Sequence, residues 1–230
     1  MVKGIFFDVW GTLFLYGDMS VELSEWLAVF HRCLQRHGVA IDQRAFREYW
    51  HSRLSKAEMP AVDDGLTIFE RRIKTAGHDC GVEIASADIR QIANELLPVW
   101  DKYISLDPAC IPLLENLKNR GVVLGLISNF DHPPYVRALL RQSRLEEFFS
   151  AIVISGETHT KKPDPDIFRL ALRMAVLEAS DSIHVGDSEE DILGANSAGL
   201  ISVLIDRVGL GRRWGQSHTV KSLDEIRGMI

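Results

Sequence analysis

The most informative stretch lies near the start of the chain and reads Ile5-Phe6-Phe7-Asp8-Val9-Trp10-Gly11-Thr12-Leu13. Its large apolar side chains predict a buried strand over residues 4–9, because the run is too short for a stable helix and too bulky for a loop. The strand ends on a carboxylate, Asp8, and Gly11 and Thr12 then favour a sharp turn. A buried carboxylate is costly unless something uses its charge. Because ligands of parallel sheets bind at the carboxyl ends of strands, Asp8 is a candidate reacting group.

The composition is that of an ordinary globular protein without a nucleic-acid or membrane partner. The 230 residues are 46% hydrophobic and 25% charged, with a net charge of −6 and no clustered basic stripe. No apolar segment approaches the length of a membrane span, and we expect no signal peptide. Three widely spaced cysteines without a Cys-x-x-Cys pair favour a reducing setting, so a cytoplasmic location is expected. Monomer and homodimer both stay open.

Helical periodicity dominates the first half of the chain, and strand patterns resume only afterwards. Apolar residues recur at three- and four-residue steps in four segments, 21–37, 42–56, 64–76 and 86–100. Strands are then predicted over 122–127, 148–154, 182–186 and 201–205. Because helices separate these strands, we expect a doubly wound, Rossmann-like parallel sheet covered on both faces. The predicted domains are an α/β core, residues 1–15 and 106–230, and an inserted α-helical cap domain, residues 16–105.

Polar groups follow the predicted sheet's strand ends at four places. They are Asp8 with Thr12, Ser128 with Asn129, Lys162 with Asp164, and Asp187 with Asp191. Right-handed crossovers put all carboxyl strand ends on one edge, so we expect the four clusters to converge. Carboxylates are ligands for Mg²⁺, and Ser128 with backbone amides can bind a tetrahedral oxyanion. Lys162 supplies a positive charge, and Asp8 is the candidate nucleophile.

In this order, the four clusters resemble the motifs of the haloacid dehalogenase (HAD) superfamily. The matching segments are residues 8–13, Ser128-Asn129, Lys162-Pro163-Asp164-Pro165, and Gly186-Asp187-Ser188 with Asp191. One such motif is weak evidence, whereas four in the right order are specific, and they span nearly the whole chain. The helical segment stands where one subgroup carries a helical C1 cap. The resemblance implies a hydrolase with a HAD-like core, a Mg²⁺ cofactor and a small phosphorylated substrate.

The resemblance also implies a metal site. Asp8 would be both nucleophile and metal ligand, and Asp187 would be a direct Mg²⁺ ligand with Asp191 assisting. The main-chain carbonyl of Trp10 would be a further ligand, which any side chain at that position permits.

Roles toward the substrate follow from the same resemblance. Ser128 and Lys162 would bind the transferring phosphoryl group and neutralise the nucleophile, and Thr12 would orient the loop. The implied substrate-binding residues are Trp10, Gly11, Ser128, Asn129 and Lys162.

Trp10 departs from the phosphatase pattern of this superfamily. Phosphatases carry a second Asp there, which protonates the leaving group and activates water, whereas an indole cannot take up a proton. Haloacid dehalogenases carry an aromatic residue there, since a halide leaves without a proton. Their fourth motif, however, resembles Ser-Ser-Asn-x-x-Asp and works without metal. The carboxylates of residues 187–191 resemble a magnesium site instead.

Three functions therefore stay open. Mg²⁺-dependent hydrolysis of a small phosphate ester is the first expectation, with His132 or His159 able to replace the missing acid–base group. The second is carbon–halogen hydrolysis of a 2-haloacid. The third is a catalytically weak protein that binds a phosphorylated ligand or a partner.

Overall fold

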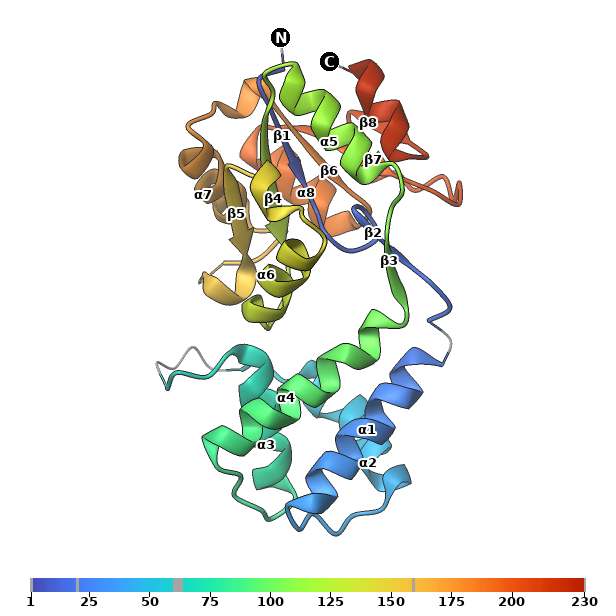
Figure 1. Ribbon diagram of the computed structural model, residues 1–230, viewed down its shortest axis with the longest axis vertical. Helices are drawn as coiled ribbons and strands as arrows, with labels where there is room; N and C mark the ends of the chain where they lie inside the picture. Colours follow the sequence, from blue (N-terminus) through green and yellow to red (C-terminus); the bar gives the residue numbers. More distant parts are fainter. Residues whose placement is uncertain (1, 20, 60–63, 159, 230) are drawn as a thin grey trace. The chain divides into compact units, whose positions relative to one another are not determined.

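The computed structural model describes residues 2–19, 21–59, 64–158 and 160–229. The chain forms two compact units (Figure 1). One combines Met1–Leu15 with Ser105–Ile230, and the other is Tyr16–Ile104. Each unit has its own buried apolar core.

A six-stranded sheet forms the centre of the larger unit. Its spatial order is β5 (Ala151–Ile154), β4 (Val123–Ser128), β1 (Gly4–Phe7), β6 (Ser182–Gly186), β7 (Ile201–Ile205) and β8 (His218–Val220). All adjacent pairs are parallel, and Phe7 lies opposite Leu126 of β4 and Val185 of β6. The predicted α/β fold with a doubly wound parallel sheet is confirmed. The strand order reverses at β1, and ligands of such sheets bind at this switch point.

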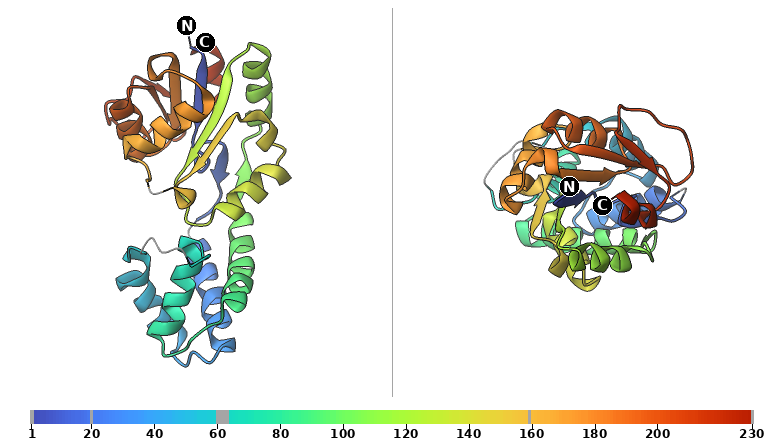
Figure 2. Two further views of the ribbon diagram at one scale, coloured as in Figure 1. Left: turned by 90° about the vertical axis from the view of Figure 1, so that its left-hand side faces the viewer. Right: turned by 90° about the horizontal axis from the view of Figure 1, so that it is seen from above.

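Helices cover both faces of the sheet (Figure 2). Helices α7 (Pro165–Ala175) and α8 (Glu189–Ala198) pack on one face, and α5 (Cys110–Asn119) packs on the other. The unit also contains α6 (Pro133–Gln142) and 3₁₀ turns at Glu146–Phe148, Ser155–Glu157, Ala179–Asp181 and Leu223–Met229.

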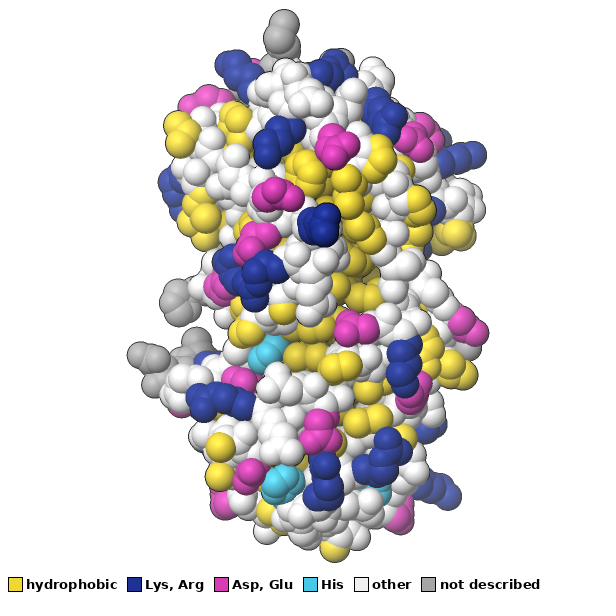
Figure 3. Space-filling model, viewed as in Figure 1, with side chains coloured by type: hydrophobic (Ala, Val, Ile, Leu, Met, Phe, Trp, Pro, Cys, Tyr) yellow, Lys and Arg dark blue, Asp and Glu magenta, His cyan; other side chains and the backbone are white. Residues whose placement is uncertain are grey.

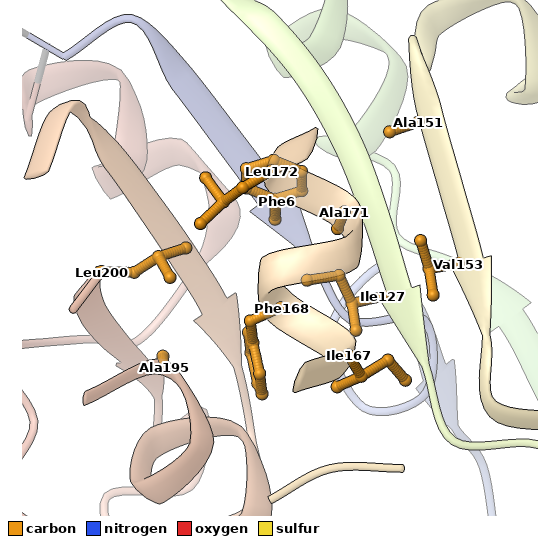
Figure 4. Packing of buried hydrophobic residues seen from close by; sticks show 10 residues of the cluster. All are labelled: Phe6, Ile127, Ala151, Val153, Ile167, Phe168, Ala171, Leu172, Ala195 and Leu200. Atoms are coloured by element: carbon orange, nitrogen blue, oxygen red, sulfur yellow. The ribbon is translucent and has the colours of Figure 1, made fainter. Parts of the chain in front are cut away.

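One face of α7 is apolar and fixes the helix on the sheet. Ile167, Phe168 and Ala171 are fully buried and pack against Phe6 of β1 and Ile127 of β4 (Figure 4). Their spacing of one and three residues places them on one side of the helix. This packing holds the loop before α7, which carries Lys162, against the carboxyl edge of the sheet.

The smaller unit is helical. It contains α1 (Glu22–Arg36), α2 (Gln43–Ser52), a 3₁₀ turn at Leu54–Lys56, α3 (Ile68–Asp79) and α4 (Ser86–Asp101). The third helix begins later than predicted because Thr67 and Glu70 form a capping box. Asp42 caps α2 by accepting a hydrogen bond from the Ala45 amide at 2.8 Å.

Aromatic side chains form the core of the smaller unit. The Trp26 ring lies 4.8 Å from that of Trp50 and 5.3 Å from that of Phe30, between centroids. Phe30 meets Phe46 edge-on at 5.1 Å. Trp26, Phe30 and Phe46 are buried, so these aromatic side chains are used for packing.

Two short strands carry the chain between the units. β2 (Phe14–Tyr16) and β3 (Ile104–Leu106) form a separate two-stranded sheet, and the Gly17 amide donates to the Tyr103 carbonyl at 2.7 Å. The sequence pattern predicted no strand between residues 16 and 105 and none after 205, so β2, β3 and β8 were missed. Each has only three residues, too few for an alternating pattern to be recognised.

Charged side chains of both signs are visible on the face shown in Figure 3. On the face shown in Figure 3, Lys and Arg side chains are interspersed with Asp and Glu side chains. Among the described residues, no helix combines the length and apolar character needed to cross a bilayer.

Candidate active site

The carboxyl ends of three neighbouring strands bring Asp8, Ser128 and Asp187 together. Asp8 directly follows β1, Ser128 ends β4, and Asp187 directly follows β6. The Asp8 amide donates to the Val185 carbonyl of β6 at 2.9 Å, so the strand pairing reaches the carboxylate. Residues far apart in the sequence therefore share one edge of the sheet, as the strand pattern predicted.

Lys162 joins two of the carboxylates. Its ammonium donates to Asp8 Oδ1 at 2.6 Å, to Asp191 Oδ1 at 2.6 Å and to the Ile127 carbonyl at 3.2 Å. The side chain is only 3% exposed. Its backbone is held by Asn129, whose Oδ1 accepts from the Lys162 amide at 2.8 Å and whose Nδ2 donates to the Lys162 carbonyl at 2.9 Å. Asn129 thus contacts the lysine backbone.

Asp191 is fully buried, and its carboxylate accepts four hydrogen bonds. Its Oδ1 accepts from Lys162 and, at 2.8 Å, from His184 Nε2. Its Oδ2 accepts from the Ser188 hydroxyl at 2.6 Å and the Ser188 amide at 3.1 Å, in the capping box of α8. Burial raises the pKa of the Asp191 carboxyl, but Lys162 and His184 outweigh burial and hold it well below the ordinary value. Four donors occupy the four lone-pair positions of this carboxylate.

His184 donates to Asp191 as a neutral ring. Burial lowers the pKa of His184, although Asp191 opposes the change. Because an ionised carboxylate only accepts hydrogen bonds, the proton of the neutral ring must be on Nε2. His184 therefore orients Asp191 and adds no charge to the site.

Three carboxylates cluster beside Lys162, which contacts two of them. Oxygens of Asp8, Asp187 and Asp191 lie within 4.8 Å of one another. Burial raises the pKa of Asp8 to about 7 despite the charge of Lys162. Burial, together with Asp191, raises the pKa of Asp187 to about 6. Hard oxygen donors with excess negative charge are the donor set that fits a divalent cation such as Mg²⁺.

Lys162 keeps its proton in this environment. Burial alone would lower the pKa of Lys162, but Asp191 and Asp8 raise it above the ordinary value. The side chain is consequently a fixed positive charge and cannot act as a base near neutral pH.

Two glycines allow this close approach of the carboxylates. Gly11 has φ +74°, and a Cβ on it would lie 2.2 Å from Asp187 Oδ2. A Cβ on Gly186 would lie 2.2 Å from Asp191 Cγ. A Cβ at either position would force the facing carboxylate to shift, so the two glycines let the backbone lie against the acidic cluster.

Two hydroxyl groups at the site have no protein partner. The oxygens Thr12 Oγ1 and Ser128 Oγ are buried, and neither has a hydrogen-bond partner among the described residues. A buried hydroxyl that lacks a partner costs free energy, so both are available for an oxyanion of a bound ligand.

Trp10 belongs to an aromatic cluster beside the carboxylates. Its ring lies 5.2 Å from Phe130, 6.1 Å from Phe14 and 6.2 Å from Tyr135, and it is stacked on Tyr135 with an interplanar angle of 8°. The indole Nε1 is buried and has no partner in the described part of the chain. The side chain brings no titratable group to the site.

Three further residues were singled out from the sequence. Asp164 is exposed and caps α7 by accepting from the Asp166 amide at 2.9 Å. His132 is buried at the start of α6. His159 lies outside the described residues.

Sequence reasoning missed two residues at this edge, Arg207 and Arg212. Arg207 donates to the carbonyls of Gly11 and Thr12, and Arg212 donates to the Asp187 carbonyl at 3.3 Å. The available signal was that both lie in the segment after the strand at 201–205, with Arg207 two residues beyond its end.

Comparison with known proteins finds one matching family model and related phosphatases. A family model described as haloacid dehalogenase-like hydrolase matches residues 2–199. Glyceraldehyde 3-phosphate phosphatase of Methanopyrus kandleri is 35% identical over 208 residues, covering 90% of this chain and 85% of that protein. Phosphoglycolate phosphatase of Pseudomonas fluorescens is 27% identical over 172 residues, covering 74% of this chain and 63% of that protein.

Solved structures share the fold. A HAD phosphatase from Thermococcus onnurineus superimposes with a TM-score of 0.73 at 22% identity, covering 99% of this chain and 97% of that one. A 2-haloacid dehalogenase from Pseudomonas syringae pv. tomato superimposes with a TM-score of 0.67 at 23% identity, with the same coverage. At these identities the likeness establishes the fold alone.

Proposed function

Because this chain belongs to the haloacid dehalogenase-like hydrolases, we propose that it hydrolyses a small phosphate ester, with Mg²⁺ as cofactor and Asp8 as nucleophile. One observation carries the proposal: the Lys162 ammonium lies 2.6 Å from both Asp8 and Asp191, within a group of three carboxylates. Such a site needs a further cation and suits an anionic substrate. The phosphatase names of the two relatives support the same activity.

Asp8 would act by covalent catalysis. Because Lys162 occupies Oδ1, we assign Oδ2 of Asp8 as the oxygen that attacks phosphorus. The bond between phosphorus and the ester oxygen breaks, its electron pair stays on that oxygen, and an aspartyl phosphate forms. The alkoxide takes its proton from solvent water, because the Trp10 indole cannot supply one. Water then attacks phosphorus and releases inorganic phosphate, which restores the Asp8 carboxylate. Lys162 holds Asp8 in place throughout, because its charge is fixed.

Asp8, Asp187 and the main-chain carbonyl of Trp10 are the proposed direct metal ligands. Asp191 would assist without binding the metal directly, since its two oxygens already accept four hydrogen bonds. Bound Mg²⁺ would neutralise charge on the phosphoryl group and on the carboxylates.

The phosphoryl oxygens would bind to groups on the loops after β1 and β4. Ser128 Oγ and Thr12 Oγ1 are the available hydroxyls, and Gly11 lets the backbone come close. Lys162 supplies the positive charge, and Asn129 keeps the Lys162 backbone in place. We further propose that residues 16–104 serve as the cap that selects substrates.

Trp10 favours a second candidate function. Its indole cannot protonate an alkoxide leaving group, and a halide needs no proton. Carbon–halogen hydrolysis of a 2-haloacid through the same Asp8 therefore remains the alternative. The three clustered carboxylates weigh against it, because without a metal ion Lys162 alone would have to balance their charge. A phospho-ligand or partner-binding protein with weak catalysis is the remaining possibility.

A product assay separates these functions. Phosphate release from glyceraldehyde 3-phosphate, phosphoglycolate and other small phosphomonoesters would be measured with Mg²⁺ and with chelator, beside halide release from 2-haloacids. Mg²⁺-dependent phosphate release that is lost in Asp8→Asn supports the proposal. The matched control is Asp166→Asn, an exposed carboxylate paired with Arg169. Halide release insensitive to chelator would replace the proposal with the dehalogenase, and neither product would favour the binding role.

A further inference from the structure

Arg207, on the loop after β7, forms hydrogen bonds with the backbone of the turn that follows Asp8. Its Nε donates to the Gly11 carbonyl at 3.2 Å, and its Nη2 donates to the Thr12 carbonyl at 2.7 Å. The same Nη2 forms an ion pair with Asp107 Oδ2 at 2.8 Å. The Asp107 side chain is 8% exposed and that of Arg207 is 25% exposed, so solvent screens this pair little. Only a guanidinium presents several donors in a fixed fork that can serve all three acceptors.

Asp107 binds the same turn through its own backbone and pairs with Arg207. Its own amide donates to the Leu13 carbonyl at 2.9 Å, and its Oδ1 accepts from the Ala109 amide at 2.8 Å. Three successive carbonyls, those of residues 11, 12 and 13, are thereby bound by the Arg207–Asp107 pair. The turn after the candidate nucleophile has little freedom to shift.

The loop that carries Arg207 is itself fixed. Asp206 donates its amide to the Val220 carbonyl at 2.8 Å. Its carboxylate accepts from the Leu210 amide at 3.1 Å and the Gly211 amide at 2.8 Å. Burial raises the pKa of Asp206, but these amide donors outweigh burial and lower it overall, as expected for a carboxylate bound by backbone N–H groups. The backbone next to Arg207 is therefore held in place by the hydrogen bonds of Asp206.

We propose that Arg207 is a positioning residue for the reaction, acting through the backbone of residues 9–14. The turn it holds carries Asp8, the Trp10 carbonyl and Gly11, whose Cα lies tight against the Asp187 carboxylate. A small shift of this turn would separate Asp8 from Asp187. Arg207 lies beyond residues 2–199, which the family model matches. The expected rate effect rests on the proposed function, whereas the expected effect on loop order does not.

The test compares Arg207→Met with Arg169→Met, which removes an exposed arginine paired with Asp166 at 2.8 Å. Hydrogen–deuterium exchange would follow the amides of Gly11, Leu13 and Phe14, which are bonded within the turn. We expect at least about 10-fold faster exchange of these amides in Arg207→Met and no change in Arg169→Met.

Steady-state kinetics of the same variants give the second readout. At saturating Mg²⁺ we expect kcat of Arg207→Met to fall about 10- to 100-fold with KM changed less than about threefold, as for a misplaced nucleophile. Arg207→Ala should regain part of its kcat with added ethylguanidinium, whereas Arg169→Met should need no rescue. If Arg207→Met folds poorly, Arg207→Met/Asp107→Asn removes the unpaired buried charge and serves instead.

Two results would overturn the positioning role. One is unchanged exchange at residues 11–14, and the other is unchanged kcat with faster exchange, which would make Arg207 a stability residue only. If the wild type releases no phosphate, the proposed function fails, and the exchange experiment alone still decides whether Arg207 holds the turn.

Discussion

Replacing Asp8 by Asn should abolish turnover and yet stabilise the metal-free protein. Burial raises the pKa of Asp8 from an ordinary 3.8 to about 7. Because the folded pKa is raised, the contribution of Asp8 to stability is fully present below about pH 4 and is lost as the pH rises through about 7. At about 1.36 kcal/mol per pKa unit, the loss amounts to about 4 kcal/mol above pH 7. Asn carries no charge to bury and keeps an oxygen for Lys162.

Urea unfolding and thermal scans at pH 8 in chelator would measure this effect. Asp8→Asn should be about 1–4 kcal/mol more stable than the wild type, which corresponds to a Tm about 3–12 °C higher for a chain of this size. The advantage should shrink as the pH falls and disappear well below pH 3.8, where Asp8 is protonated in both the folded and the unfolded state. It should also shrink with Mg²⁺ at pH 8. Asp166→Asn, on the exposed first turn of α7, should show none of these changes. If Asp8→Asn were less stable than the wild type in chelator at pH 8, the charged Asp8 carboxylate would not be destabilising the folded state, and the raised pKa of Asp8 would be contradicted.

Three further changes test other parts of the site. Lys162→Met should lose turnover and about 3–5 kcal/mol of unfolding free energy, because two buried carboxylates lose their shared cation; unchanged urea midpoints would contradict this. Trp10→Asp should raise the phosphatase rate about 10-fold or more by supplying an acid–base group, and a kcat that stays flat would mean that this group is not limiting. Gly194→Ala should lower stability by about 1–3 kcal/mol, since its Cβ would lie 2.3 Å from Phe168, whereas Gly228→Ala, which meets nothing within 4 Å, should unfold like the wild type.

Much of the core could be predicted from the sequence because its strands are long apolar runs that end on polar groups. The run ending at Asp8 and the one ending at Ser128 each identified a buried strand and a residue at the carboxyl edge. The parallel order of the sheet followed from the alternation of strands and helices. The local sequence pattern was enough to predict these strands, because a strand buried on both faces consists of a short continuous run of apolar residues.

Other features depend on contacts that no local pattern encodes. The sequence places Asp191 beside Asp187, but only the fold reveals that Lys162, His184 and Ser188 occupy both of its oxygens. Arg207 is separated from the turn it holds by nearly the whole chain. The short strands β2, β3 and β8 form because their neighbours supply partners, and three residues alone carry too little periodicity to predict them.

The pairing of β2 with β3 makes the helical unit separable in principle. Since the Gly17 amide bonds the Tyr103 carbonyl at 2.7 Å, the insertion leaves the α/β chain and rejoins it at almost the same point. A turn of a few residues in place of the four helices would therefore close the chain with little loop entropy to overcome. The core can accordingly accept a different insertion, or none, without a change in the strand ends that hold Asp8 and Asp187. The helical unit and the strand ends can then change independently of each other, because the chain passes between them at one pair of adjacent residues.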